Sequence, residues 1–379
     1  MKITKIEPLL CDSAWGVWVF IKVQTDEGIT GWGECSDHRG CTYGMLGCVK
    51  DLEMALIGKD PRPVEKLYAD MYRLARQALG GVALKAIAGI DTALWDIKAK
   101  ALGVPVYELF GGPYQEKIRA YWGHAGLYRT RIADLMKIPH IRNLDDIHAM
   151  GKEIVNKGFT ALKTNIMLSG EPDQTSLQDN VAILKKIVSI FRDAVGDKVD
   201  IAVDINATFN NNGFSTVARA MEPFELMWLE VDSNDPAALL ELKKSTRIPI
   251  CSGGILSTSK AFDPFLTMRS MDIANVEVAG CGFTEARRIA TLAETRELLI
   301  TPYNAGSHLL TFMTSHLCAS VPNVKIMGMD IDAAPWKDDI VTDVPDIKDG
   351  YIYIPRKPGL GVELNEKEIA KHPWHGHRG

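Results

Sequence analysis

Polar side chains end a series of short apolar runs in the second half of the chain. The runs "FTALKTN", "VDIAVDIN" and "LMWLE" carry Lys163 with Asn165, Asp204 with Asn206, and Glu230 at their ends. Carboxylates that converge on one point suit a hard cation such as Mg²⁺, because such a cation prefers oxygen ligands. The pattern therefore indicates a pocket in which a lysine lies beside a cation held by carboxylates.

Three further runs continue the series with other residue types. "RIPICSGG" ends in Gly254, where the neighbouring runs lead us to expect a carboxylate, and "MDIANVE" and "ELLITPY" end in Glu277 and Tyr303. His124 in "WGHAG" and His308 in "NAGSHLL" lie in predicted loops from which either could reach a substrate. We include these polar side chains among the candidates for the same pocket.

Eight apolar runs alternate with helical stretches between about residues 114 and 354. They are "KIRAYWG", "FTALKTN", "VDIAVDIN", "LMWLEV", "RIPICSG", "MDIANVEV", "ELLITPYN" and "NVKIMGM". Such alternation predicts a parallel sheet, and eight repeats over roughly 240 residues are typical of a (β/α)₈ barrel. Active-site groups of this barrel come from the C-terminal ends of its strands, so the polar run ends would meet at one face.

The residues before the barrel have a different pattern. Two alternating apolar runs flank "DEG" at 26–28, which indicates a β-hairpin, and apolar residues recur with a helical period over 82–102. The final segment returns to strand and turn composition. We therefore predict an α/β protein with an α+β capping domain, formed by residues 1–113 plus 355–379, and a barrel catalytic domain over residues 114–354.

Composition excludes several classes of protein. The formal net charge is −5 and no run of Lys or Arg exceeds two residues, so we expect no nucleic-acid partner. We also expect no membrane span, no signal peptide, a cytoplasmic location and seven reduced, mostly buried cysteines. A small molecule is the expected partner, and we expect a homo-oligomer.

Long motifs at both ends of the barrel resemble the enolase superfamily, specifically its mandelate racemase and muconate-lactonizing group. They are "IAGIDTALWDIKAKALGVPVYELFGG" and "PGLGVEL", with "VDIN", "WLE" and "CGFTEARRIATLAE" in the family's order. Members use a lysine or histidine base and Mg²⁺ that stabilises an enediolate. The resemblance implies that Asp204 and Glu230 are metal ligands, that Lys163 is the base, and that Asn206 faces the metal or the substrate.

The same comparison implies four departures in the pocket. Gly254 stands at the position of the third carboxylate ligand, and Asn165 replaces the second lysine of a Lys-x-Lys motif. Glu277 and Tyr303 occupy the positions of the family's aspartate and histidine dyad, while Gly328 stands near a glutamate of many members. We therefore expect weakened Mg²⁺ binding, and Tyr303, polarised by Glu277, as an acid on the opposite face.

These implications lead to a lyase or isomerase, such as a dehydratase, cycloisomerase or racemase, acting on a hydroxylated carboxylic acid or its lactone. Two alternatives remain: a catalytically silent protein that binds a sugar acid, and metal-free Schiff-base chemistry at Lys163. Loops near the N-terminus are expected to close over the pocket. They supply the substrate-binding candidates Trp15, His38 and Arg39, beside Asn165, Asn206, His124 and His308.

Overall fold

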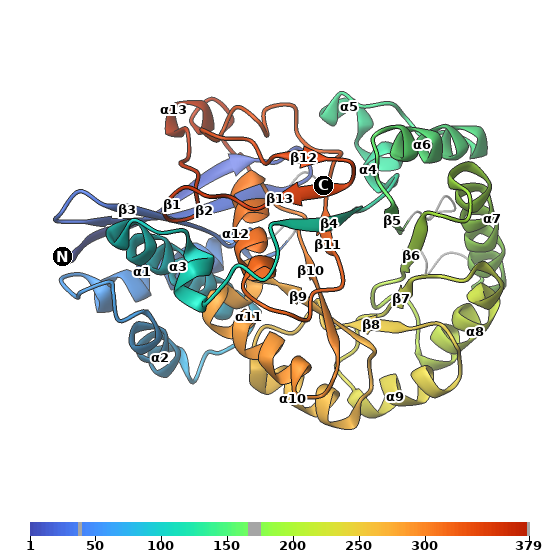
Figure 1. Cartoon of the computed structure of the whole chain (residues 1–379), viewed down its shortest axis with the longest axis horizontal. Coiled ribbons are helices and arrows are strands. Elements are labelled where there is room, and N and C mark those ends of the chain that lie inside the picture. Colours follow the sequence, from blue (N-terminus) through green and yellow to red (C-terminus); the bar gives the residue numbers. More distant parts are fainter. Residues whose placement is uncertain (37–39, 166–175, 377–379) are drawn as a thin grey trace.

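The computed structural model describes residues 1–36, 40–165 and 176–376, and it shows a barrel with a second unit packed on one side (Figure 1). His38 and Arg39 lie outside the described residues. The α/β fold with a capping unit is as predicted. The exact domain boundaries given above stay a prediction.

The capping unit combines a three-stranded antiparallel sheet with three helices. Its elements are β1 (Ile3–Asp12), β2 (Val17–Thr25), β3 (Thr30–Glu34), α1 (Thr42–Leu56), α2 (Val64–Ala75) and α3 (Gly81–Leu102). The sheet order is β1-β2-β3, and the β2–β3 turn is the predicted hairpin. The expected helix over 82–102 is confirmed as α3, which ends where Gly103 adopts a left-handed conformation (φ 71°).

The predicted apolar runs form eight parallel strands among the described residues. They are β4 (Lys117–Trp122), β5 (Ala161–Thr164), β6 (Asp200–Asp204), β7 (Trp228–Glu230), β8 (Ile250–Ser252), β9 (Ile273–Glu277), β10 (Leu299–Tyr303) and β11 (Met327–Met329). Neighbours pair in chain order from β4 to β10, and β11 returns to pair with β4. Backbone hydrogen bonds of 2.9 Å on either side of Ile300, with Asn323 and Lys325, join β10 to the segment before β11 and close the barrel.

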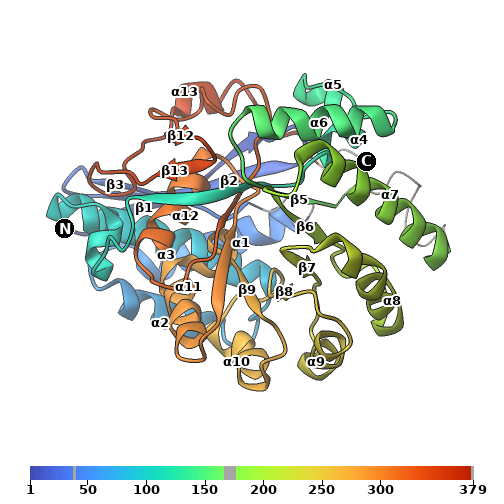
Figure 2. The same ribbon diagram turned by 45° about the vertical axis from the view of Figure 1, so that its right-hand side comes forward.

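Helices form the outer layer of the barrel, as the rotated view also shows (Figure 2). They are α6 (Leu144–Asn156), α7 (Leu177–Val195), α8 (Asn211–Met221), α9 (Pro236–Lys244), α10 (Ser259–Met268), α11 (Val278–Glu294) and α12 (His308–Ala319). Short helices α4 (Leu127–Arg131) and α5 (Ala133–Met136) follow β4, and 3₁₀ turns span Val106–Phe110 and Glu222–Phe224. Apolar side chains alternate inward and outward along the strands, so a small inner cluster fills the barrel between Tyr121, Trp228 and Ile326.

The C-terminal segment runs back along the barrel to the capping unit. Its elements are β12 (Ile347–Lys348), β13 (Tyr351–Tyr353) and α13 (Glu366–Ile369). Strand β13 pairs antiparallel with β4, and Pro105 bridges Gly359 beyond it. The segment therefore contacts both units, and its assignment to the capping domain stays a prediction.

Buried carboxylates of the capping unit bind backbone and hydroxyl groups of the barrel helices. Asp91 on α3 is fully buried and accepts from Thr284 Oγ1 at 2.6 Å and from Thr284 N at 3.0 Å. Glu34, at the end of β3, accepts from the backbone of Ser307 and Leu310 at the start of α12. Free amides at helix starts need acceptors, so these carboxylates fix the capping unit above the strand ends.

The Asp91→Ala variant should lose about 2–3 kcal/mol of unfolding free energy, because two buried donors of Thr284 lose their acceptor. Urea unfolding followed by circular dichroism measures this loss. Asp51→Ala on the exposed side of α1 is the matched control and should change stability by less than about 0.5 kcal/mol. Equal stability of both variants would show that Asp91 does not contribute to fixing the units.

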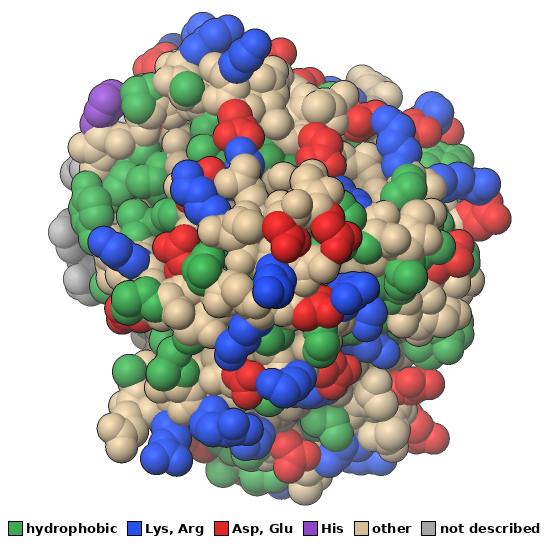
Figure 3. All heavy atoms as spheres, turned by 90° about the vertical axis from the view of Figure 1, so that its left-hand side faces the viewer, with side chains coloured by type: hydrophobic (Ala, Val, Ile, Leu, Met, Phe, Trp, Pro, Cys, Tyr) green, Lys and Arg blue, Asp and Glu red, His purple; other side chains and the backbone are tan. Residues whose placement is uncertain are grey.

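Figure 3 shows Lys and Arg interspersed with Asp and Glu on the face it presents. All seven cysteines are free thiols, and five of them are buried, as expected. Across the described ranges, no helix is long and apolar enough to cross a membrane.

Candidate active site

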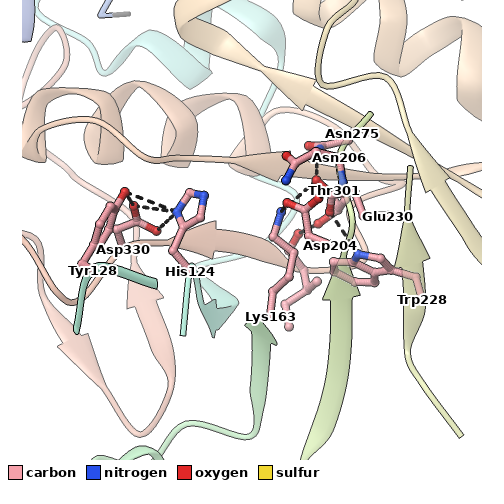
Figure 4. A network of polar contacts seen from close by, with 11 residues as sticks. His124, Tyr128, Lys163, Asp204, Asn206, Trp228, Glu230, Asn275, Thr301 and Asp330 are labelled. Atoms are coloured by element: carbon pink, nitrogen blue, oxygen red, sulfur yellow. Dashed lines mark hydrogen bonds and ion pairs between the residues drawn. The ribbon is translucent and has the colours of Figure 1, made fainter. Parts of the chain in front are cut away.

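Lys163, Asp204 and Glu230 meet at the C-terminal ends of β5, β6 and β7 (Figure 4). Lys163 Nζ donates to Asp204 Oδ2 at 3.1 Å and to Glu230 Oε1 at 2.8 Å. All three side chains are buried, with 2–6% of their surface exposed. The structure thus brings together the lysine and the two carboxylates that the sequence singled out.

The charges of this cluster depend on one another. Burial alone lowers the pKa of Lys163, but the negative charges of Asp204 and Glu230 outweigh it and raise that pKa well above its ordinary value. Burial raises the pKa of Glu230, and Lys163 opposes the rise. Lys163 therefore keeps its proton in this arrangement and balances the carboxylates, while its role as the base stays a prediction.

Two neighbours orient Glu230. Trp228 Nε1 donates to Glu230 Oε2 at 3.1 Å, and Asn275 Nδ2 donates to Glu230 Oε1 at 2.8 Å. Asn275 is 1% exposed, and its Oδ1 has no hydrogen-bond partner among the described residues. Buried polar atoms are nearly always paired in proteins, so this oxygen retains the capacity to accept one more hydrogen bond.

The space beside Gly254 is occupied by other polar side chains. A Cβ built on Gly254 would lie 3.3 Å from Asp232 Oδ1 and 3.4 Å from Asn275 Nδ2. Asp232 Oδ1 is buried and has no hydrogen-bond partner among the described residues. Burial and the negative charges of Asp204 and Glu230 raise the pKa of Asp232 to about 7. A carboxylate from the strand-end loop after β7 thus lies where the expected β8 carboxylate is missing.

A second glycine is explained by an aromatic neighbour. A Cβ on Gly328 of β11 would lie 2.4 Å from the Tyr121 hydroxyl. Tyr121 belongs to β4 and is fully buried, and its hydroxyl has no hydrogen-bond partner among the described residues. A side chain at position 328 would collide with this phenol, so Tyr121 occupies the space beside Gly328.

Glu277 and Tyr303 lie side by side at the ends of β9 and β10, where they are register partners. The Tyr303 ring also faces Lys163, whose Nζ lies 5.4 Å from the ring centroid. Burial and the negative charge of Glu277 raise the pKa of Tyr303 well above its ordinary value. A phenol held in this way donates its proton less readily than an ordinary tyrosine, and the acid role of Tyr303 stays a prediction.

His124 belongs to a second polar cluster that follows β4 and β11. Its Nδ1 lies 2.9 Å from both carboxylate oxygens of Asp330, and the Tyr128 hydroxyl donates to Asp330 Oδ2 at 2.7 Å. The His124 ring also packs edge-on against Tyr303, with centroids 6.2 Å apart. Figure 4 shows this cluster beside the one around Lys163, so both share the strand-end face.

The remaining candidates occupy different places. Trp15 packs on Tyr128 with centroids 5.5 Å apart and lines a small pocket with Asp330, so an N-terminal loop does cover this face. Asn165 Oδ1 is buried without a partner among the described residues, and the backbone of Asn206 donates to Asp204 at 2.9 Å.

His308 Nε2 bonds Asp338 at 2.7 Å, and burial lowers the pKa of His308 to about 4, so it is neutral near pH 7. Substrate contacts of these residues stay predictions.

Sequence reasoning missed Asp330, Tyr128, Asn275 and Asp232. Asp330 could have been found, because it directly follows the apolar run "KIMGM" as Asp204 follows "DIAV". Asp232 lies two residues beyond Glu230, in a loop whose direction no periodicity gives. Its position becomes visible only when β7 and β8 lie side by side.

No three carboxylate, imidazole or thiolate groups of the described residues form a ready-made cation site. Asp204 and Glu230 are instead paired with the ammonium group of Lys163. Asp232 supplies a third acidic side chain beside these two, with an unpartnered oxygen. Mg²⁺ prefers carboxylate oxygens of this kind as ligands. The residues therefore fit such an ion once Lys163 gives up its ion pair with one of the two carboxylates.

A capped barrel with carboxylates at the ends of successive strands defines the class as the enolase superfamily. Residues 14–111 match the mandelate racemase/muconate lactonizing enzyme N-terminal domain, and residues 146–368 match the enolase C-terminal domain-like family. The chain belongs to the mandelate racemase/muconate lactonizing enzyme family of this superfamily, as the motifs predicted.

Relatives of the chain include dehydratases and a cycloisomerase. D-Galactonate dehydratase of Pectobacterium atrosepticum is 30% identical over 384 residues, which cover 98% of this chain and 94% of that protein. A Burkholderia xenovorans protein described as an L-alanine-DL-glutamate epimerase and crystallised with magnesium and fumarate is 31% identical, with a TM-score of 0.94 and coverage of 98% and 96%. The 3,6-anhydro-D-galactonate cycloisomerase of Zobellia galactanivorans is 26% identical, with a TM-score of 0.86 and coverage of 98% and 99%.

Proposed function

We propose that the chain is a lyase or isomerase that removes the proton α to the carboxylate of a hydroxylated sugar acid, with dehydration as the leading reaction. The observation that carries the proposal is the buried cluster of Lys163, Asp204 and Glu230 at the strand ends. Dehydratases of D-galactonate among the relatives support a sugar acid as the substrate class.

Asp204 and Glu230 would hold Mg²⁺, with Asp232 beside them. When bound, Mg²⁺ would stabilise negative charge that develops on the substrate carboxylate, as family members require. The relative that binds magnesium and fumarate supports this cofactor and a carboxylic acid ligand. The unpartnered oxygens of Asn165 and Asn275 are suited to accept hydrogen bonds from substrate hydroxyls.

Lys163 would act as the base that removes the α-proton from one face of the substrate. Its ammonium group pairs with the two carboxylates, and it can release its proton only when another positive charge takes over that pairing. Trp228 and Asn275 hold Glu230 in position meanwhile. The proposal thus assigns binding, orientation and proton transfer to residues of four strands.

Solvent deuterium exchange tests the proposal directly. The full chain with Mg²⁺ is incubated in D₂O with D-galactonate, its C2, C3 and C4 epimers and 3,6-anhydro-D-galactonate, and proton NMR follows the α-hydrogen and any 2-keto product. We expect at least one acid to exchange or to eliminate water, and the Asp204→Asn variant to reduce that rate by at least about 100-fold.

The outcomes separate the proposal from its alternatives. Calorimetric binding of an acid without exchange by the wild type would contradict the proposal and indicate a sugar-acid-binding protein. Borohydride trapping of a carbonyl compound on Lys163 would instead indicate Schiff-base chemistry.

A further inference from the structure

We infer that His124 and Asp330 form a proton-donating dyad that protonates the hydroxyl leaving group of the substrate. The inference rests on the proposed function. That function needs a group that protonates the leaving hydroxyl, and the inference names this group. Neither residue belongs to the pair that the family resemblance assigns to the usual dyad, Glu277 and Tyr303, which are register partners on β9 and β10. The dyad comes from the first and last barrel strands, which pair directly through Trp122 and Met329.

The geometry of the pair is that of an oriented histidine. Asp330 is 4% exposed and holds His124 Nδ1 at 2.9 Å, while the Tyr128 hydroxyl donates to the same carboxylate at 2.7 Å and lies 3.4 Å from His124 Nδ1. Lys337 Nζ also donates to the backbone oxygen of Asp330 at 3.1 Å. No described residue hydrogen-bonds His124 Nε2, and Figure 4 shows that ring edge turned toward the side of Lys163. Nε2 is therefore free to meet a substrate.

The backbone around His124 is arranged for this contact. His124 adopts a left-handed conformation with φ of 43°, which is unfavourable for a residue with a side chain. A Cβ on the preceding Gly123 would lie 2.5 Å from Asp330 Oδ1, so only glycine lets the carboxylate approach. Strain of this kind persists where the surrounding structure holds a functional side chain in place.

The charge of Asp330 prepares His124 to carry a proton. Burial lowers the His124 pKa, but the charge and hydrogen bond of Asp330 outweigh burial and raise that pKa above its ordinary value. The other groups that act on the imidazole or lie against it come from four elements: Tyr128 on α4, Lys163 on β5, Asp204 on β6 and Tyr303 on β10. Tyr303, by comparison, has a pKa raised well above that of an ordinary phenol and is the poorer donor.

The proposed step balances as follows. The base removes the α-proton, its electron pair forms the Cα–Cβ double bond, and the Cβ–O bond breaks. His124 gives its Nε2 proton to the departing oxygen, so water leaves and a neutral imidazole remains. The base releases the α-proton to solvent, and solvent returns a proton to His124. The enol product becomes the 2-keto acid by taking up a proton at Cβ and losing the proton of its 2-hydroxyl group.

The test uses the acid that the exchange experiment selects, together with its analogue in which fluorine replaces the β-hydroxyl. Fluoride leaves without a proton. For His124→Asn we expect water elimination to fall by about 100-fold or more, whereas fluoride elimination changes by less than about fivefold. The half-buried His148 on α6 gives the matched control His148→Asn, which should change neither rate. Equal losses with both leaving groups, or leaving-group dependence in Tyr303→Phe instead, would overturn the inference.

A second readout does not depend on turnover. NMR of the full chain labelled with ¹⁵N-histidine gives the His124 pKa, with His124→Asn for assignment. Asp330→Asn should lower that pKa, because the imidazolium loses its negative neighbour. Since the protonated form donates, elimination declines as pH rises through the His124 pKa, and Asp330→Asn should move this decline to lower pH. An unchanged His124 titration would contradict the dyad.

Failure of the proposed function can be told apart from failure of the dyad. If no acid of the panel exchanges or eliminates, the proposed function is wrong and the donor role falls with it, whatever the titration shows. If exchange occurs and His124→Asn eliminates water as fast as the wild type, only the dyad is wrong.

Discussion

The Lys163→Met variant should lose α-proton exchange by about 10³-fold or more, on the scale of a positioned acid or base. It should also lose about 3–5 kcal/mol of unfolding free energy in EDTA, because Asp204 and Glu230 would face each other in a buried site without a positive charge. Methionine preserves most of the side-chain volume, so the loss reports the charge. Urea unfolding and NMR exchange in D₂O measure the two effects.

Mg²⁺ should restore much of the stability of Lys163→Met, because the cation then replaces the ammonium group between the same carboxylates. Exchange of the substrate α-proton should not recover in this variant when Mg²⁺ is added. Lys157→Met, of an exposed lysine beyond the end of α6, is the matched control and should match the wild type in both measurements. Wild-type exchange in Lys163→Met would remove this lysine from the base role, and unchanged stability in EDTA would show that the ion pairs contribute nothing.

Glu230→Gln should weaken Mg²⁺ binding to the free chain by more than about 100-fold, beyond the range typical of residues that only support metal ligands. Isothermal titration calorimetry of the full chain with MgCl₂ measures this directly, without reference to turnover. Asp232→Asn should weaken binding by about tenfold or more, which corresponds to roughly 1.4 kcal/mol. The reason is that Asp232 Oδ1 lies unpartnered beside the carboxylate pair, in the space left by Gly254.

Moving the third carboxylate from residue 232 to residue 254 tests whether its place in space, and not its place in the chain, matters for Mg²⁺ binding. Gly254→Asp combined with Asp232→Asn should recover much of the Mg²⁺ affinity, because the built Cβ of residue 254 lies 3.3 Å from Asp232 Oδ1. Asp193→Asn, of an exposed carboxylate on α7, should bind as the wild type does. Full affinity in Asp232→Asn alone would show that two carboxylates suffice.

The sequence by itself determined the architecture. Each apolar run from "KIRAYWG" to "NVKIMGM" became a barrel strand, because buried parallel strands need nearly continuous apolar residues. The order of strand ends also placed Lys163, Asp204 and Glu230 together, since all parallel strands end at one face. The motif over 87–112 became α3 and its following turn, with Asp91 buried against α11.

Only the tertiary structure decided how the pocket is completed. Asp232 and Tyr121 fill the spaces beside Gly254 and Gly328, and no sequence pattern shows which side chain enters a space left by a distant glycine. Asp330 and His124 are 206 residues apart and meet because β11 closes the barrel against β4. Hydrogen bonds and charge pairing act over a few ångströms, so the partners of each polar group were set by barrel closure and not by spacing along the chain.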